Sequence, residues 1–95
     1  MKQIKRYPFS FRKHAHDLEY RRNRAMCEYW ELDREDASDT PKGKALECLI
    51  ERLTEILYYR PNSEGIVWLT GKEIGLAKES VIWADNARAT ANARA

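Results

Sequence analysis

Hydrophobic residues recur at helical spacing over residues 11–35. The positions follow one another at alternating intervals of four and three, which is the period of one face of an α-helix. No glycine or proline interrupts this stretch, so we expect one unbroken helix. Arg22 stands inside the apolar seam and interrupts it. The seam consists of Phe11, Ala15, Leu18, Arg22, Ala25, Tyr29 and Leu32.

A second apolar face covers residues 41–59 and predicts a second helix. Asp39 or Thr40 is placed to cap its start, and Pro41 suits its first turn. Pro61 stops the helix near Tyr59, because proline disfavours helical backbone in the residue before it. The apolar face consists of Leu46, Leu49, Ile50, Leu53, Ile56 and Leu57.

The last third of the chain predicts a third helix over residues 70–88. Thr70 and Glu73 match a capping box, and Leu69 and Ile74 are placed as the hydrophobic staple that accompanies it. The short apolar run at 66–69 forms either a strand-like segment or a loop pinned to the core. Residues 70–81 resemble the start of a helix-turn-helix, but they are too few for two helices, so we expect one continuous helix.

These segments predict an all-α fold in which a long antiparallel hairpin, formed by the first two helices, packs against a C-terminal third helix. The result is a three-helix bundle within a single domain of 95 residues. Residues 1–10 form a basic arm in which Ser10 caps the first helix. Large apolar side chains end at Trp83, so residues 89–95 are expected to be a fraying tail.

Charge is unevenly distributed along the chain. The net charge is +2, but residues 1–25 hold eight basic and two acidic side chains, while residues 26–65 hold five basic and ten acidic ones. An antiparallel hairpin would bring these opposite charges together. We therefore expect two sets of pairs: Glu51 and Glu55 near Arg21 to Arg24, and Lys42 and Lys44 near Glu31 and Asp33.

The sequence offers no catalytic or metal-binding motif. His14 and His16 would point to nearly opposite sides of a helix, so they cannot share one metal ion. Cys27 and Cys48 have neither a CxxC nor a zinc spacing, and we expect two half-buried thiols that stay reduced in the cytoplasm. No stretch is long and apolar enough for a membrane span. We therefore expect no enzyme activity, no cofactor, no metal and no membrane association.

Two functions remain, and the first is protein binding. Trp30 and Met26 lie off the apolar seam, and Trp and Arg dominate interface hot spots. The chain resembles in kind the small accessory proteins of phages and mobile elements, which often inhibit a host protein by occupying it. The candidate partner-binding residues are Arg21, Arg22, Arg24, Trp30 and Met26.

The alternative is a regulator that binds nucleic acid through the basic arm and the first half of helix 1. The two hypotheses differ in whether Arg21, Arg22 and Arg24 are free or are neutralised by Glu51 and Glu55. Homo-oligomerisation through leftover apolar helix surface is a third, weaker hypothesis.

Overall fold

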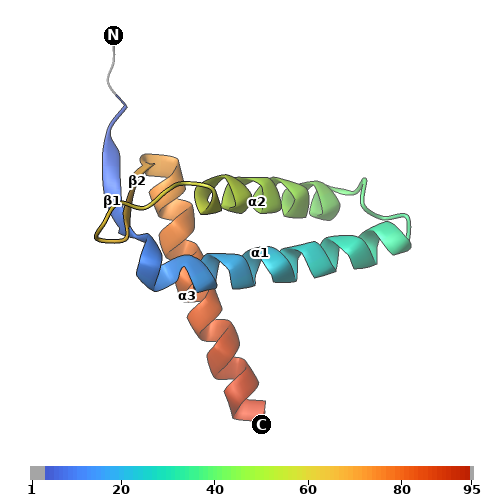
Figure 1. Ribbon diagram of the computed structural model, residues 1–95. Coiled ribbons are helices and arrows are strands. Elements are labelled where there is room, and N and C mark those ends of the chain that lie inside the picture. Colours follow the sequence, from blue (N-terminus) through green and yellow to red (C-terminus); the bar gives the residue numbers. More distant parts are fainter. Residues whose placement is uncertain (1–3, 95) are drawn as a thin grey trace.

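The computed structural model describes residues 4–94 and contains three helices and a small two-stranded sheet (Figure 1). Of the residues that the structure describes, 71% are helical. The elements follow in the order β1 (Arg6–Ser10), α1 (Phe11–Arg34), α2 (Pro41–Leu57), β2 (Ile66–Thr70) and α3 (Gly71–Arg94). The predicted fold of a helical hairpin with a third helix is confirmed, with the sheet as an addition.

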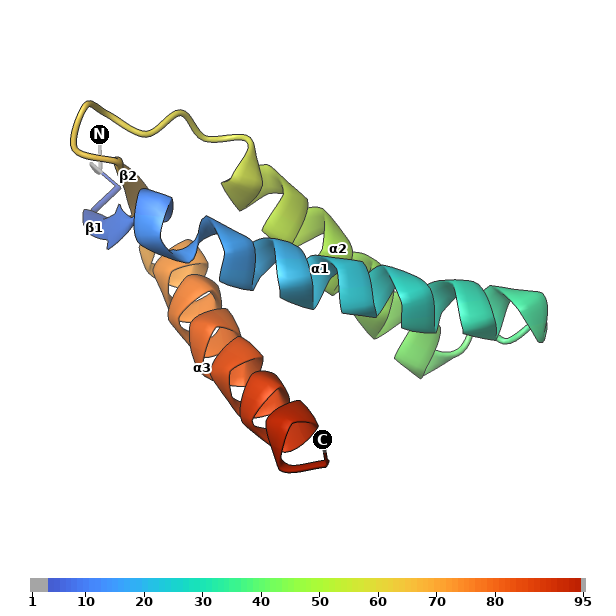
Figure 2. The same cartoon turned by 60° about the horizontal axis from the view of Figure 1, so that its bottom comes forward.

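Helices α1 and α2 form the predicted antiparallel hairpin, side by side in both views (Figures 1 and 2). Every residue of the predicted α1 seam is buried or half-buried, including Arg22. Leu53 and Ile56 are the fully buried residues of the α2 face. At the start of α2, the Thr40 hydroxyl accepts a hydrogen bond from the Gly43 amide at 3.3 Å, so Thr40 is the cap.

The predicted basic arm is in part a strand, which corrects the expectation for residues 6–10. β1 pairs antiparallel with β2, from Arg6 opposite Thr70 to Ser10 opposite Ile66. The inward-facing pair Phe9 and Val67 is buried, and this burial holds the sheet against the helices. Of the two alternatives for 66–69, the strand is therefore the correct one.

The turn before β2 also anchors the start of α1. Asn62 Oδ1 accepts hydrogen bonds from the amides of Glu64 and Ile66, and Gly65 has φ +79°, where a side chain would be strained. The Gly65 carbonyl accepts from the Arg12 amide at 3.0 Å. Ser10 occupies the N-cap position but makes no side-chain cap bond, because this turn satisfies the helix end instead.

Helix α3 begins with the predicted capping box and runs without a break. The Thr70 amide donates to Glu73 Oε1 at 2.9 Å, and the Glu73 amide donates to Thr70 Oγ1 at 3.3 Å. The continuous helix confirms that 70–81 is not a helix-turn-helix. It continues through Arg94, beyond the expected end at residue 88, and its second half leads away from the hairpin in both views (Figures 1 and 2).

The buried core lies where the sheet, α3 and the hairpin meet, and not along the whole hairpin. The fully buried large apolar side chains are Leu18, Leu53, Ile56 and Leu69. The molecule is open and thin, with extents of 45 × 40 × 17 Å and a radius of gyration of 15.1 Å, against about 12 Å for a compact domain of this length. Within residues 4–94, no helix combines the length and apolarity that crossing a membrane requires.

Candidate partner-binding site

The outer half of the hairpin lacks a third layer. We call residues 26–34 of α1 and 41–50 of α2 the outer hairpin. Ala25 is the last buried residue of α1, and within the outer hairpin only Gly43 is buried. The apolar side chains there are half-buried. They are Met26, Tyr29, Leu32, Leu46, Leu49 and Ile50. Each helix is covered mainly by the other, and on one side Leu46 and Leu49 also line a hollow together with Trp83 of α3.

A groove between the two helices opens on this outer half, and we call it the hairpin groove. Its volume is about 190 Å³. Trp30 is the largest exposed side chain in it, with 56% of its surface accessible. The groove is lined by Met26, Tyr29 and Trp30 from α1 and by Glu47, Ile50 and Glu51 from α2. The groove therefore combines aromatic and aliphatic side chains with two acidic residues of α2.

The five candidate residues identified from the sequence are divided between two places. Met26 and Trp30 share the hairpin groove. Arg21 and Arg24 line a smaller hollow of about 80 Å³ on the other side of α1, together with Trp83 of α3. Arg22 lines neither. The structure therefore brings two of the five into the groove and separates the arginines from them.

The predicted pairing of the α1 arginines with Glu51 and Glu55 is wrong. Arg21 instead reaches α3, where it donates to Ser80 Oγ at 3.0 Å and to Glu79 at 3.2 Å. Among residues 4–94, Arg22 and Arg24 have no carboxylate within ion-pair distance. The sequence could not reveal this, because it does not fix where α3 crosses α1.

Arg22 is the least satisfied polar side chain. It is half-buried, and its Nε atom is buried without a hydrogen-bond partner. Arg24, by contrast, is exposed. The two arginines therefore differ: Arg24 is available at the surface, whereas Arg22 contributes mainly its aliphatic stem to the hairpin seam.

Two further expectations are corrected at the hairpin. Lys44 lies 3.8 Å from Asp39 on the connecting loop; among the described residues, neither Lys42 nor Lys44 pairs with Glu31 or Asp33. Cys27 and Cys48 are free thiols, as predicted, but both are exposed and not half-buried. The thin, two-layer outer hairpin explains this exposure, because each helix there is covered mainly by the other.

A polar clamp that the sequence did not reveal holds α3 against α1. Asp17 is buried, and its carboxylate accepts a hydrogen bond from Arg88 and bonds to His14 Nδ1 at 3.2 Å. Arg88 also lies over the Tyr20 ring, 5.4 Å from its centre. The His14–Asp17 spacing of three was visible in the sequence, but Arg88 lies 71 residues from Asp17.

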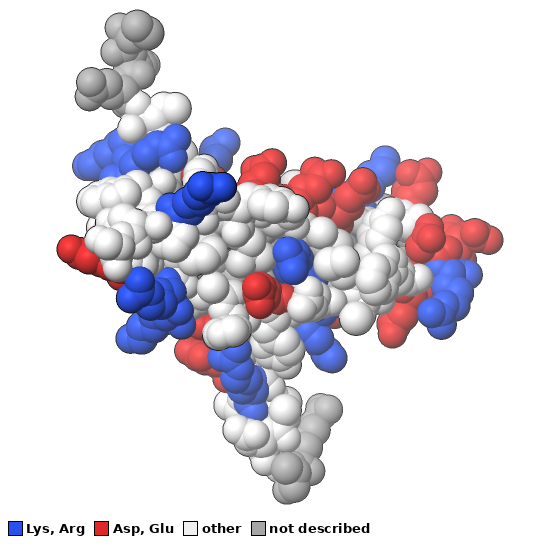
Figure 3. Space-filling view, viewed as in Figure 1, with Lys and Arg blue, Asp and Glu red and all other residues white. Residues whose placement is uncertain are grey.

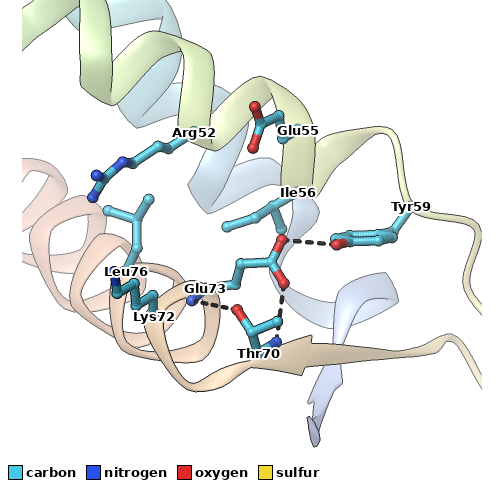
Figure 4. Close-up of a pocket in the computed structure, with 8 residues that line it drawn as sticks. All are labelled: Arg52, Glu55, Ile56, Tyr59, Thr70, Lys72, Glu73 and Leu76. Carbon is cyan, nitrogen blue, oxygen red and sulfur yellow. Dashed lines mark hydrogen bonds between the residues drawn. The ribbon is translucent and has the colours of Figure 1, made fainter. Parts of the chain in front are cut away.

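A cavity of about 300 Å³ lies between the end of α2 and the start of α3. Figure 4 shows Tyr59 and Thr70 on either side of the Glu73 carboxylate, with Arg52 and Lys72 toward the other end. Tyr59 donates to Glu73 Oε2 at 2.8 Å, and the Thr70 amide bonds the other oxygen. Both carboxylate oxygens of Glu73 are therefore occupied by hydrogen bonds that tie the start of α3 to β2 and to the segment after α2.

The hydrogen bonds also set the pKa of Glu73. Burial alone would raise this pKa, but hydrogen bonds from Thr70 and Tyr59, together with the charge of Arg6, outweigh it and lower the pKa below its usual value of 4.5. Glu73 is therefore held as a carboxylate in the folded protein.

Charge is polarised between the two ends of the molecule. Figure 3 shows lysine and arginine gathered at the end that carries the strands, and aspartate and glutamate gathered along α2 and at the outer hairpin. Among residues 4–94, no three His, Cys, Asp or Glu side chains are grouped closely enough to hold a metal ion. In comparisons with protein-family models, curated proteins and solved structures, no significant match to this chain was found.

Proposed function

We propose that this chain is a small, non-enzymatic protein-binding module. Its hairpin groove takes a basic amphipathic helix of a partner protein. By occupying that helix, the module inhibits or regulates the protein that carries it. The observation that carries the proposal is the hairpin groove, whose lining residues come from α1 and α2 and which leaves Trp30 56% exposed.

The surface area supports a missing partner. The chain exposes 7210 Å², whereas a monomeric protein of 11.2 kDa is expected to expose about 5700 Å². The excess, about 1500 Å², is larger than the roughly 800 Å² that one partner contributes to a standard interface. The second half of α3, which leads away from the hairpin, supplies part of this excess, and an interface on the outer hairpin would use the part that lies there.

The chemistry of the groove points to a basic helical partner. Met26, Trp30 and Ile50 offer the hydrophobic floor that receives the apolar face of a helix. Glu47 and Glu51, both exposed, supply negative charge beside it. Lysines or arginines flanking the apolar stripe of a partner helix would complement these carboxylates, which favours correct encounter and orientation.

Selection from a displayed peptide library tests this proposal. Peptides are selected on the wild-type chain and counter-selected on Trp30→Ala. We expect the survivors to carry apolar residues at i, i+3, i+4 and i+7 with lysine or arginine beside them. Their affinity should fall about thirtyfold or more for Trp30→Ala, as for a hot-spot residue. Tyr58→Ala is the matched control, because Tyr58 is an exposed aromatic residue outside the groove.

Three outcomes would contradict the proposal. The first is that no peptide depends on Trp30. The second is that the selected peptides are acidic. The groove carboxylates should repel such peptides, so their selection would mean that these carboxylates do not set the specificity. The third is a stable dimer in light scattering that Trp30→Ala dissociates, which would assign the groove to a second copy of this chain. Thermal melts of both variants exclude loss of fold as the cause.

A further inference from the structure

The outer face of the sheet carries an exposed tryptophan with no role in the fold. Direct partners in an antiparallel pair share a face, so the register places Pro8 beside Trp68, and Arg6 with Thr70 next to them. Val67 and Leu69 point to the opposite face and are buried. Trp68 has 54% of its surface accessible. A large flat aromatic surface therefore faces solvent in the middle of the sheet.

Cations lie at both ends of this sheet. Arg6 Nη1 donates to the Trp68 carbonyl at 3.2 Å. Lys5 and Lys72 lie near the same end but not on the Trp68 face. The Lys5 ammonium lies 5.6 Å from the centre of the Tyr7 ring, on the face that Tyr7 shares with Leu69, and Lys72 lines the cavity beside Glu73. Arg12 lies at the other end, where its Nη2 donates to the Ser63 carbonyl at 3.1 Å.

None of these four cations forms a close ion pair within the described chain, although the charge of Arg6 acts on Glu73 from a longer distance. Lys5, Arg6, Arg12 and Lys72 have no carboxylate within ion-pair distance among residues 4–94. Arg21 and Arg88, deeper in the fold, do have such partners. Figure 3 shows the resulting concentration of positive charge at the end that carries the strands. This is the end opposite the acidic outer hairpin.

We propose that this face, centred on Trp68, binds single-stranded nucleic acid. A base would stack on the Trp68 indole, and the phosphates on either side would meet Arg6 toward one end and Arg12 toward the other. Stacking on an aromatic platform between cations that follow the backbone is the general mode of single-strand binding. This second surface is independent of the hairpin groove.

The geometry favours a single strand over a duplex. Trp68 offers its ring from the face of a short sheet, about 16 Å long for five residues. A ring in this position reaches a base only if the base is already unstacked, and bases in a duplex are stacked on one another. A duplex would meet the same cations but not the indole.

Fluorescence anisotropy with a labelled oligothymidylate tests the proposal on the full chain. We expect binding at low salt whose affinity falls with salt. The slope of log K against log salt should be about −1.4, since two phosphate contacts contribute about −0.7 each. Trp68→Ala should weaken binding about tenfold, which corresponds to the loss of one stacked base. A labelled duplex of equal charge should bind more weakly and be insensitive to Trp68→Ala.

Matched variants separate this surface from general charge. The pair Arg6→Gln and Arg12→Gln removes the two cations at the ends of the Trp68 face, and it should reduce both affinity and salt slope. The pair Lys42→Gln and Lys44→Gln removes the same charge at the outer hairpin and should change neither. Trp30→Ala, an equally exposed tryptophan at the other end, should leave oligonucleotide binding intact.

The proposal fails if there is no binding at low salt, or if Trp68→Ala binds like wild type. It also fails if the Arg6–Arg12 and Lys42–Lys44 double variants lower affinity equally, since the attraction would then be nonspecific. Equal binding of duplex and single strand would contradict the stacking step. Trp68 is half exposed, so melting curves should show the Trp68→Ala fold intact. None of these outcomes depends on whether the hairpin groove binds a peptide.

Discussion

The two halves of the hairpin share the same helices but have opposite characters. Near the sheet, α1 and α2 are covered by α3 and the strands, and Leu18, Leu53 and Ile56 are completely buried. In the outer hairpin, the same apolar period continues, but only Gly43 is buried. A seam with helical spacing thus shows which face of a helix is apolar. Whether that face is buried depends on the elements that reach it.

The comparison also concerns charge. The sheet end carries cations without carboxylate partners in the described chain, whereas the outer hairpin carries carboxylates beside an apolar groove. The antiparallel pairing expected from the sequence would have cancelled these charges along the hairpin. They remain separated because the α1 arginines meet α3 or solvent instead. The molecule therefore offers two surfaces of opposite charge.

The largest expected difference between the halves is in the stability lost when a leucine is shortened to alanine. Leu53→Ala, in the buried core, should lower the free energy of unfolding by about 3 kcal/mol. Leu46→Ala, on the same face of α2 but half-buried in the outer hairpin, should cost about 1 kcal/mol. Urea denaturation measures both. Equal costs would mean that the outer hairpin has a core of its own, which would remove the case for a missing partner.

The next largest effect is expected at the polar clamp of Asp17 and Arg88, which joins α1 to α3. Arg88→Gln leaves the buried Asp17 carboxylate without its charged partner and should cost about 2 kcal/mol. Asp85→Asn is the control, because Asp85 is an exposed neighbour of Arg88, 3.6 Å away, and it should change stability by less than about 0.5 kcal/mol. If Arg88→Gln is as mild as the control, α3 is held by packing alone.

Glu73 should make the sheet end sensitive to acid. The pKa of Glu73 is lower in the folded protein than in the unfolded chain, where it is near 4.5. The stability that the Glu73 carboxylate contributes is therefore fully present above pH 4.5 and is lost as the pH falls through the folded-state pKa. Glu73→Gln should therefore cost about 1 kcal/mol at neutral pH, with the difference shrinking toward pH 3. Chemical denaturation across pH measures this. Glu47→Gln in the hairpin groove is the control and should show no such trend.

The smallest effects concern two glycines and have opposite signs. A Cβ at Gly43 would overlap the backbone of Ser38, so Gly43→Ala should destabilise the hairpin tip by about 1 kcal/mol. Gly75, within α3, has nothing within 4 Å of that position, so Gly75→Ala should stabilise by about 0.5 to 1 kcal/mol through helix propensity. Thermal melts measure whether each variant is more or less stable than the wild type. Destabilisation by Gly75→Ala as well as by Gly43→Ala would contradict the prediction.

Much of the fold could be predicted from local pattern. The three helices, the Thr40 cap and the Thr70–Glu73 capping box each depend on residues within one or two helical turns. Strand β1 could not be predicted, because five residues around Pro8 give too short an alternation, and their partner lies in β2. The Arg21 and Arg88 contacts also depend on where α3 crosses α1.

The candidate site was predicted in part for the same reason. Trp30 and Met26 stood out because they lie off the apolar seam, and the structure places both in one groove. The arginines were assigned partners on α2 from charge complementarity alone, without knowledge of α3. The exposure of Trp68 could not be predicted, because a tryptophan in a short apolar run is normally part of the core. Only the strand pairing shows that it faces outward.

The three tryptophans provide the most direct test of the claim that the two ends are separate binding surfaces. Trp30 reports on the hairpin groove, Trp68 on the sheet face, and Trp83 on the packing of α3 near Tyr20. Their indole N–H signals can be followed by NMR while oligothymidylate and a selected basic peptide are titrated separately. We predict that the oligonucleotide shifts Trp68 alone and the peptide shifts Trp30 alone. Both ligands shifting the same indole, or neither shifting any, would contradict the account.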